Sequence, residues 1–284
     1  MKYIIYDINK KKNTFYCLIN GQKVGFYLTK SLQKIFIDYL DSGYLVDFEI
    51  NDFYKSINKM KHYQVSYFNK IEQLKPYRVL YDLEVLRDDM KKVITQYDNY
   101  LFLDFEMTMP PYSHKNPFVA EIIQFGAILT DNKGNELLER NYYVSPQKRP
   151  SIRTIKFLDL DLDEFQKEAK AYEHFYLDLK QILKTYQPKI VVWGKNDIIA
   201  LDDSYKINEL MPLTDDHNFF NLLVLHKDYF NINQDIGLFK AYQTYFPDNK
   251  IRLQKHNALD DARVTKSIFF EFLKELKQNT INHS

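Results

Sequence analysis

Short stretches of alternating or β-branched hydrophobic residues, separated by turn residues, fill the first 76 residues of the chain. They predict five strands, at Tyr3–Asp7, Thr14–Ile19, Lys23–Leu28, Tyr44–Ile50 and Tyr63–Ile71. Between the third and fourth strands, apolar residues recur at the helical spacing i, i+3, i+4 and i+7, and Thr29 can cap a helix that reaches Leu40. The pattern therefore predicts a small β-rich module over residues 1–76.

Three strands, a helix and two strands is the element order of an OB-like β-barrel, in which single-stranded nucleic acid can stack on aromatic side chains. Other small barrels share this order. Two functions therefore stay open for residues 1–76. The barrel binds nucleic acid, or it only docks on a neighbouring module and its aromatic residues fill its own core.

A helical stripe of apolar residues follows Pro76, which ends the fifth strand. The stripe predicts a helix over Val79–Tyr97. We interpret residues 77–98 as a connecting helix between two modules.

The remaining residues predict an α/β module over 99–280 and a short tail, 281–284. Strands are expected at Tyr100–Glu106, Glu121–Thr130, Glu139–Val144 and Ile190–Trp193. Apolar stripes predict a helix over Asp163–Thr185 and another that begins at Asn257 within the segment Gln254–Phe270. The proline-containing segment Thr108–Phe118 is expected to form a loop that shapes a substrate entrance.

Charge is distributed unevenly between these modules, although the net charge of the 284-residue chain is only +1. Residues 1–75 hold 12 Lys, no Arg and 7 acidic residues, a balance of +5. The remainder has a balance of −4. The chain is therefore not basic throughout, and the lysine-rich front and acidic back suggest two modules with different functions.

Cysteine content and hydropathy narrow the class of protein further. The single cysteine, Cys17, cannot form an internal disulfide or a cysteine-based zinc site. Hydrophobic residues make up 45% of the chain, enough for packed cores, yet no apolar run is long enough to span a bilayer. The charged N-terminus does not resemble a signal peptide. We therefore expect a cytoplasmic protein without a membrane partner.

Two carboxylates end the first strand of the second module. Asp104 and Glu106 are two residues apart, so both project from the same face of that strand. Two carboxylates side by side on one face of a strand repel each other, and a hard divalent cation such as Mg²⁺ or Mn²⁺ would compensate their charge. A solvent-facing acidic pair is the alternative.

Later carboxylates and one histidine are candidates for the same site. Asp197 follows a buried strand and opens a helix, where α/β folds place their ligands, although it could serve only as a helix cap. Asp202 and Asp203 are rival candidates further along that helix. His256 and Asp261 flank the start of the last predicted helix, which would place the imidazole near a metal held by Asp261.

These residues together resemble the motifs of the DEDDh (DnaQ-like) 3′–5′ exonucleases. The motifs are Asp104-Phe-Glu106, Trp193-Gly-x-x-Asp197 and His256-x-x-x-x-Asp261, in this order. The similarity covers roughly residues 99–277, and is closest to the Eri-type exoribonucleases and the bacterial sporulation-inhibitor relatives. Flanking segments EIIQFGAIL, VVWGKND and GLFKAYQTYF support it. The resemblance implies an RNase H-like core, with a mixed central sheet flanked by helices.

The resemblance also implies a mechanism. Asp104, Glu106, Asp197 and Asp261 would bind two divalent ions, Mg²⁺ or Mn²⁺, and His256 would act as general base on the attacking water. Met107, Thr108 and the backbone of Phe105 would pack against the terminal nucleotide. The substrate would be single-stranded nucleic acid, RNA favoured over DNA, with nucleoside 5′-monophosphates released from the 3′ end.

The chain departs from the family pattern in one segment. Phe157–Phe165 reads FLDLDLDEF where relatives carry a Leu-Thr-Gly-Ile-like turn. Alternatives therefore stay open: a regulatory or nucleic-acid-binding protein on the exonuclease fold, a DNA-specific proofreading or repair exonuclease, and an RNase H-like endonuclease. RNase H-like endonucleases lack a motif like the one that His256 and Asp261 form in this chain.

Overall fold

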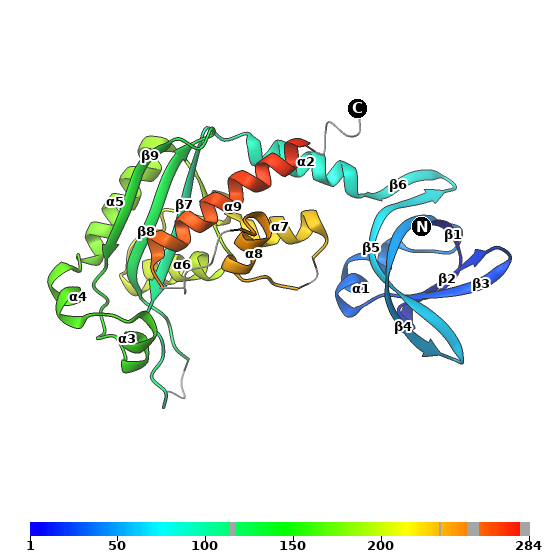
Figure 1. Ribbon diagram of the computed structural model, residues 1–284, viewed down its shortest axis with the longest axis horizontal. Coiled ribbons are helices and arrows are strands. Elements are labelled where there is room, and N and C mark those ends of the chain that lie inside the picture. Colours follow the sequence, from blue (N-terminus) through cyan, green and yellow to red (C-terminus); the bar gives the residue numbers. More distant parts are fainter. Residues whose placement is uncertain (114–116, 233, 249–255, 279–284) are drawn as a thin grey trace. The chain divides into compact units, whose positions relative to one another are not determined.

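The computed structural model describes residues 1–113, 117–232, 234–248 and 256–278, and Figure 1 shows its elements. Contacts divide the chain into two compact units, Met1–Lys92 and Val93–Ser284. Each unit has its own hydrophobic core. The predicted tail, 281–284, and the first residues of the predicted segment Gln254–Phe270 lie outside the described residues.

The first unit contains a closed β-barrel. Its strands are β1 (Lys2–Asn9), β2 (Thr14–Ile19), β3 (Gln22–Tyr27), β4 (Leu45–Ile57) and β5 (Met60–Leu74). They pair in the order β3-β2-β1-β4-β5, and a parallel pairing of β3 with β5 closes the ring. The short helix α1 (Lys30–Phe36) lies between β3 and β4 in the chain, and the 3-10 turn η2 (Ile37–Tyr39) follows it.

The barrel core is aromatic. Phe15, Phe26, Phe48 and Phe68 are fully buried and their rings contact one another. The expected small barrel is therefore confirmed, and part of its aromatic content does fill the core. The predicted cap is present as well, since Thr29 Oγ1 accepts the N–H of Leu32 at 3.3 Å.

The predicted connecting helix is wrong in its first part. Residues Tyr77–Asp82 form strand β6, which pairs with the far end of β5, and helix α2 covers only Leu83–Thr95. Strand β5 runs longer than predicted, through Leu74, and so offers an edge on which β6 pairs. The carboxylate of Asp82 then accepts the N–H groups of Glu84 and Val85 and starts the helix.

The second unit is built on one mixed sheet, as expected. Its strands are β7 (Asn99–Met107), β8 (Ile122–Asp131), β9 (Glu136–Tyr143), β10 (Lys189–Val192) and β11 (Phe219–Asn221), in the order β11-β10-β7-β8-β9. β7, β10 and β11 run parallel, whereas β8 is antiparallel to both of its neighbours. The carboxyl ends of β7 and β10 therefore meet at one edge of the sheet.

Helices cover both faces of this sheet (Figure 1). The helices are α3 (Ile152–Leu158), α4 (Leu162–Glu168), α5 (Tyr172–Tyr186), α6 (Asn196–Ile207), α7 (Leu222–Phe230), α8 (Leu238–Tyr245) and α9 (Ala258–Gln278), with the 3-10 turn η3 (Asp216–Asn218). Residues of α5 and α6 share a core with one face. Helix α9 packs across the other face, where its Phe269 contacts Tyr100 and Phe102 of β7.

The single helix predicted over Asp163–Thr185 is also wrong. It divides into α4 and α5 because the chain between them joins the end of β9. There Lys170 donates its N–H to the carbonyl of Tyr143 and accepts the N–H of Ser145. The elements α3, β11, α7 and α8 were not predicted individually. Of the described helices, none combines the length and the apolar character needed to span a bilayer.

Candidate metal centre

Strand alternation places two carboxylates under helix α9. Tyr100 and Phe102 of β7 face this helix, so the next two residues of the same parity, Asp104 and Glu106, face its N-terminal end. Helix α9 carries Asp261 in its first turn. The sequence thus brings together carboxylates that lie far apart along the chain.

A glycine lets α9 approach this closely. Gly126 of β8 pairs directly with Asp104, and a Cβ added there would lie 2.1 Å from the backbone carbon of Ala258. Because this neighbour is backbone, a side chain at position 126 would force the first turn of α9 away from the sheet. Gly126 therefore sets the distance between Asp261 and the carboxylates of β7.

Two side chains fix the start of α9. Asn257 Oδ1 accepts the N–H groups of Leu259 and Asp260 at 3.1 and 3.3 Å, as a helix cap does. Gln124 of β8 accepts the N–H of Ala258 at 3.3 Å. Gln124 is itself buried and held by a hydrogen bond to Asn141.

Asp197 reaches β7 from the edge that pairs with β10, whereas β8 pairs with the other edge of β7. It lies in the first turn of α6, just beyond the end of β10, and is 4% exposed. Strand β10 pairs with β7 only as far as Phe102, and the Asp197 Oδ1 then accepts the N–H of Phe105 at 3.0 Å. The carboxylate thus satisfies a backbone donor that the shorter strand leaves unpaired.

The rival candidates lie elsewhere. Asp202 and Asp203 are further along α6 and both form ion pairs with Lys206 on the protein surface.

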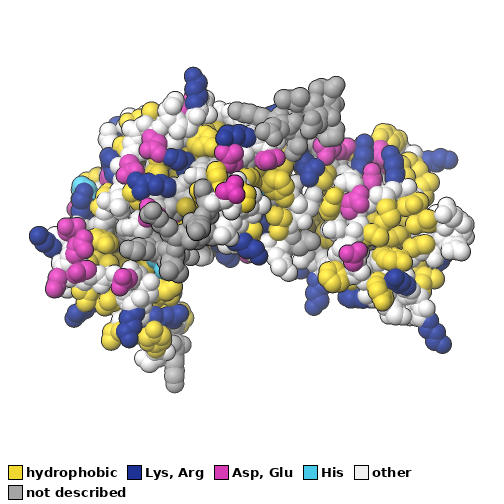
Figure 2. All heavy atoms as spheres, in the orientation of Figure 1, with side chains coloured by type: hydrophobic (Ala, Val, Ile, Leu, Met, Phe, Trp, Pro, Cys, Tyr) yellow, Lys and Arg dark blue, Asp and Glu magenta, His cyan; other side chains and the backbone are white. Residues whose placement is uncertain are grey.

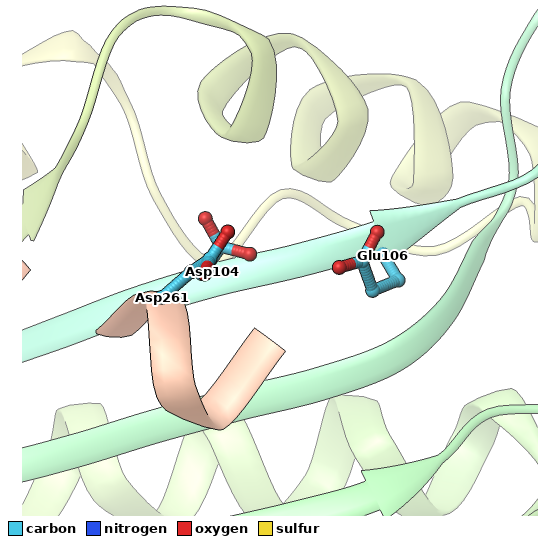
Figure 3. A group of neighbouring side chains, drawn as sticks. All are labelled: Asp104, Glu106 and Asp261. Carbon is cyan, nitrogen blue, oxygen red and sulfur yellow. The ribbon is translucent and has the colours of Figure 1, made fainter. Parts of the chain in front are cut away.

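The carboxylates of β7 and α9 form one group. Ligand oxygens of Asp104, Glu106 and Asp261 all lie within 4.8 Å of one another. Figure 3 shows the three side chains beside β7, two from the strand and one from the first turn of α9. Asp197 is near enough to raise the pKa of both strand carboxyls.

Burial and mutual repulsion disfavour the charged forms of these groups. Burial, followed by the charges of Asp197, Asp261 and Glu106, raises the pKa of Asp104 well above its usual range. Burial and the charges of Asp261 and Asp197 raise the pKa of Glu106 to about 8. Burial raises the pKa of Asp197 to about 7, although the hydrogen bond from the Phe105 N–H lowers it.

These residues fit a divalent cation. The group offers only carboxylate oxygens, the ligands that Mg²⁺ and Mn²⁺ prefer. Without a counter-charge, neutral pH would leave partly ionised carboxyls repelling one another in a buried place. Bound cations would remove that repulsion, and their affinity should rise with pH because protons leave the ligands.

His256 lies outside the carboxylate group among the described residues. Its ring stacks on Phe157 of α3, with 4.1 Å between ring centroids and 28° between planes. Both line a cavity of about 390 Å³, whose wall also includes Gln124, Asn257 and Asp260. The histidine is therefore half-buried beside the start of α9, one turn before Asp261.

The three expected nucleotide contacts have different surroundings. The side chain of Phe105 is in the core against Phe125 and Phe175, and its N–H is bound by Asp197. Met107 is half-buried against the same core. Thr108 is 8% exposed, and its hydroxyl accepts the N–H of Glu121 at the base of the following loop.

Sequence reasoning did not assign roles to Gln124, Gly126 and Phe157. A polar residue and a glycine inside the apolar strand EIIQFGAILT were the available signal, because both are unfavourable there without a specific contact. Phe157 gave no such signal, since an aromatic residue on a short helix is common in cores.

Comparison with known families decides the class of protein. The sequence model of the exonuclease (RNase T) family matches residues 101–269, more than half of the chain. The chain belongs to this exonuclease family. No curated protein matches its sequence significantly.

Solved structures of exonucleases show the same fold. A 3′-exonuclease described in recognition of the 3′ end of a histone mRNA stem-loop is 16% identical, with a TM-score of 0.55 over 64% of this chain and 65% of that one. The nuclease domain of 3′hExo, a DEDDh family member bound to rAMP, is 19% identical, with a TM-score of 0.54 over 64% and 94%. E. coli exonuclease I with a dT13 oligonucleotide is 15% identical, with a TM-score of 0.50 over 66% and 43%.

The family match confirms the expected exonuclease class, and the structural likenesses confirm the expected RNase H-like core. The family match lies within the second unit and leaves the barrel outside it.

Proposed function

We propose that this exonuclease degrades single-stranded nucleic acid from the 3′ end, RNA in preference to DNA, and releases nucleoside 5′-monophosphates. The observation that carries the proposal is the convergence of Asp104, Glu106 and Asp261 within 4.8 Å, with Asp197 beside them. Four carboxylates alone would repel a phosphodiester, so a nuclease site of this composition requires bound cations.

In this proposal Asp104, Glu106, Asp197 and Asp261 hold two divalent ions, Mg²⁺ or Mn²⁺. When bound, such ions lower the pKa of a water and stabilise the charge that develops on the scissile phosphate. The protein contributes a fixed arrangement of ligands. Asp197 is oriented by the Phe105 N–H, and Asp261 is positioned by the contact of α9 with Gly126.

His256 is proposed as the general base. An imidazole titrates near neutral pH and can accept the proton of the attacking water through one ring nitrogen. In the structure its ring stacks on Phe157, beside the start of α9.

Support for RNA comes from relatives. The structurally similar 3′-exonucleases were solved in recognition of a histone mRNA stem-loop and with rAMP, whereas exonuclease I was solved with oligo-dT. Met107, Thr108 and the backbone of Phe105 are proposed to contact the terminal nucleotide, since they directly follow or separate the carboxylates of β7.

A chain-end assay tests the proposal. Matched RNA and DNA oligonucleotides with a 5′ label are incubated with Mg²⁺ or Mn²⁺, with and without chelator, and a circular oligonucleotide serves as the endonuclease control. We expect a metal-dependent ladder that shortens from the 3′ end, faster on RNA. Cleavage of the circle would overturn the exonuclease assignment, a faster ladder on DNA would overturn the substrate preference, and binding without cleavage would indicate a regulatory protein.

A further inference from the structure

Lysine ammonium groups lie over tyrosine rings on the outside of the barrel. Lys23 Nζ is 4.2 Å from the ring centroid of Tyr16 and 5.4 Å from that of Tyr6. Lys55 Nζ is 4.6 Å from the ring centroid of Tyr27. Tyr27 itself is only 5% exposed beneath Lys55. We call the accessible surface the tyrosine–lysine face, defined by Tyr6, Tyr16, Lys23 and Lys55.

Strand register shows that much of this face is continuous. Asp7, Tyr16, Gly25, His62 and Lys55 pair directly in one row across β1, β2, β3, β5 and β4. Directly paired residues of neighbouring strands point to the same side of a sheet. Because the residues next to Tyr16 and Gly25 in sequence fill the barrel core, this row faces outward.

A histidine under the face fixes one of its rings. The Nδ1 of His62 contacts the carbonyl of Met60 at 2.9 Å, which requires a proton on Nδ1, so Nε2 accepts the hydroxyl of Tyr16 at 3.1 Å. His62 is fully buried and lies flat against Gly25, where a Cβ would be 2.5 Å from the imidazole. The Tyr16 ring is therefore held in place before any ligand arrives.

Further lysines extend the positive charge beyond both ends of the face. The 3-10 turn η1 (Lys10–Lys12) joins β1 to β2, and its three lysines are exposed. At the tip of the hairpin between β4 and β5, Lys61 lies 4.0 Å from the ring centroid of Tyr54 and 4.7 Å from that of Tyr63. Figure 2 shows exposed hydrophobic and lysine or arginine side chains side by side on the visible surface of the barrel.

We propose that the tyrosine–lysine face binds single-stranded nucleic acid, with bases stacked on the rings of Tyr6 and Tyr16 and phosphates paired with Lys23 and Lys55. The alternation of flat rings and cations matches the alternation of bases and phosphates in a single strand. The balance of +5 over residues 1–75 supplies the attraction for a polyanion. This proposal goes beyond the exonuclease activity, because the face lies outside the family match.

The ligand would replace contacts that already exist. A lysine over an exposed tyrosine is held weakly, whereas a base stacks on an aromatic ring more strongly. A base would therefore take the place of the ammonium on the ring, and the displaced ammonium would pair with a phosphate. Lys23 also forms an exposed ion pair with Asp7 at 3.0 Å, which the strand must overcome.

Fluorescence anisotropy of the full chain tests this surface. Labelled U20 and dT20 are titrated in chelator, so that no cleavage occurs, at several salt concentrations. Replacing both Lys23→Gln and Lys55→Gln should reduce the slope of log K against log salt by about 1.4, since each phosphate contact contributes about 0.7. Tyr6→Ala should weaken binding about fivefold or more and leave the salt slope unchanged.

Two control variants sharpen the reading. Lys30→Gln with Lys34→Gln removes the same charge from α1, whose lysines are exposed but outside the face, and should leave the slope unchanged. Asp7→Asn should strengthen binding, because it releases Lys23 and removes a negative charge. A duplex of the same length should bind more weakly, because its bases are already stacked inside.

The outcomes separate this proposal from the exonuclease proposal. Equal slope changes in the face and α1 variants, or no binding of either oligonucleotide, would overturn the face as a nucleic-acid site and favour a protein partner. Hydrolysis of p-nitrophenyl thymidine 5′-monophosphate with Mn²⁺ reads the carboxylate site without a long strand, and the face variants should leave its rate unchanged. If the unsubstituted chain binds the oligonucleotides but does not hydrolyse this ester, the result would count against the exonuclease proposal alone.

Discussion

The two units hold their charged groups in opposite ways. In the second unit, Asp197 and Asp261 are almost fully buried, and backbone contacts hold them together against their own repulsion. In the barrel, Lys23 and its partner Asp7 are substantially exposed and can move apart at little cost. A buried group of like charges requires a counter-ion, whereas an exposed surface gains only modest energy from each contact. Substitutions should therefore have large effects at the buried carboxylates of the second unit and small effects on the surface of the barrel.

The largest effect is expected from the strand carboxylates. Asp104→Ala should lower the exonuclease rate by about 10³-fold or more, because it removes a metal ligand. This loss is larger than the one caused by removing a single hydrogen bond to an oxyanion. The fold should survive, because the substitution removes a buried carboxyl group whose charged form is unfavourable, as its raised pKa indicates. Single-turnover cleavage and circular dichroism measure the two properties. Metal-dependent turnover at the original rate would contradict the assignment of Asp104.

His256 comes next. His256→Ala should lower turnover by about 10²–10⁴-fold with binding retained, as for loss of a general base. At a saturating metal concentration, the pH–rate profile should change once the imidazole is removed. If the variant keeps the same profile, the base is a different group.

The contact between α9 and β8 can be broken without touching a charge. Gly126→Ala should lower turnover by about 10²-fold, because it shifts the first turn of α9 and displaces Asp261. Gly237→Ala is the matched control, since a Cβ there would meet nothing within 4 Å. Similar activity in both variants would show that the first turn of α9 tolerates displacement.

The pH dependence of stability tests the buried carboxyl groups without a substitution. Raised carboxyl pKa values mean that the folded protein binds more protons than the unfolded chain. In chelator, the melting temperature should therefore fall as pH rises from about 4 towards about 8, where Glu106 titrates. Mn²⁺ should reverse this trend, and Asp104→Asn should flatten it. A melting temperature in chelator that rises over the whole range would contradict the buried repulsion.

Sequence patterns predicted the parts of the molecule whose signals are local. The strand YLFLDFE, the turn VVWGKND and the cap Asn257 each carry their structure within a few residues, so the second unit's sheet and the placement of its carboxyl-bearing elements could be anticipated. Strand β6 could not, because residues 77–82 become a strand only where the long β5 provides an edge. The break between α4 and α5 likewise depends on the partner strand β9.

The position of His256 was the least predictable feature of the site. Its spacing from Asp261 indicates a shared location, but the ring contact with Phe157 depends on a helix from a different part of the chain. The tyrosine–lysine face also required the strand register, because Tyr16 becomes a neighbour of His62 only when β3 pairs with β5 and closes the barrel.

The docking of α9 on Gly126 has a consequence for the order of events during synthesis. Asp104 and Glu106 leave the ribosome long before Asp261, which arrives with the helix that covers the sheet. A nascent chain that lacks α9 has only part of the ligand set and an uncovered sheet face. Nuclease activity should therefore begin only after this helix has been translated and has packed, so cellular nucleic acid is protected from the unfinished enzyme.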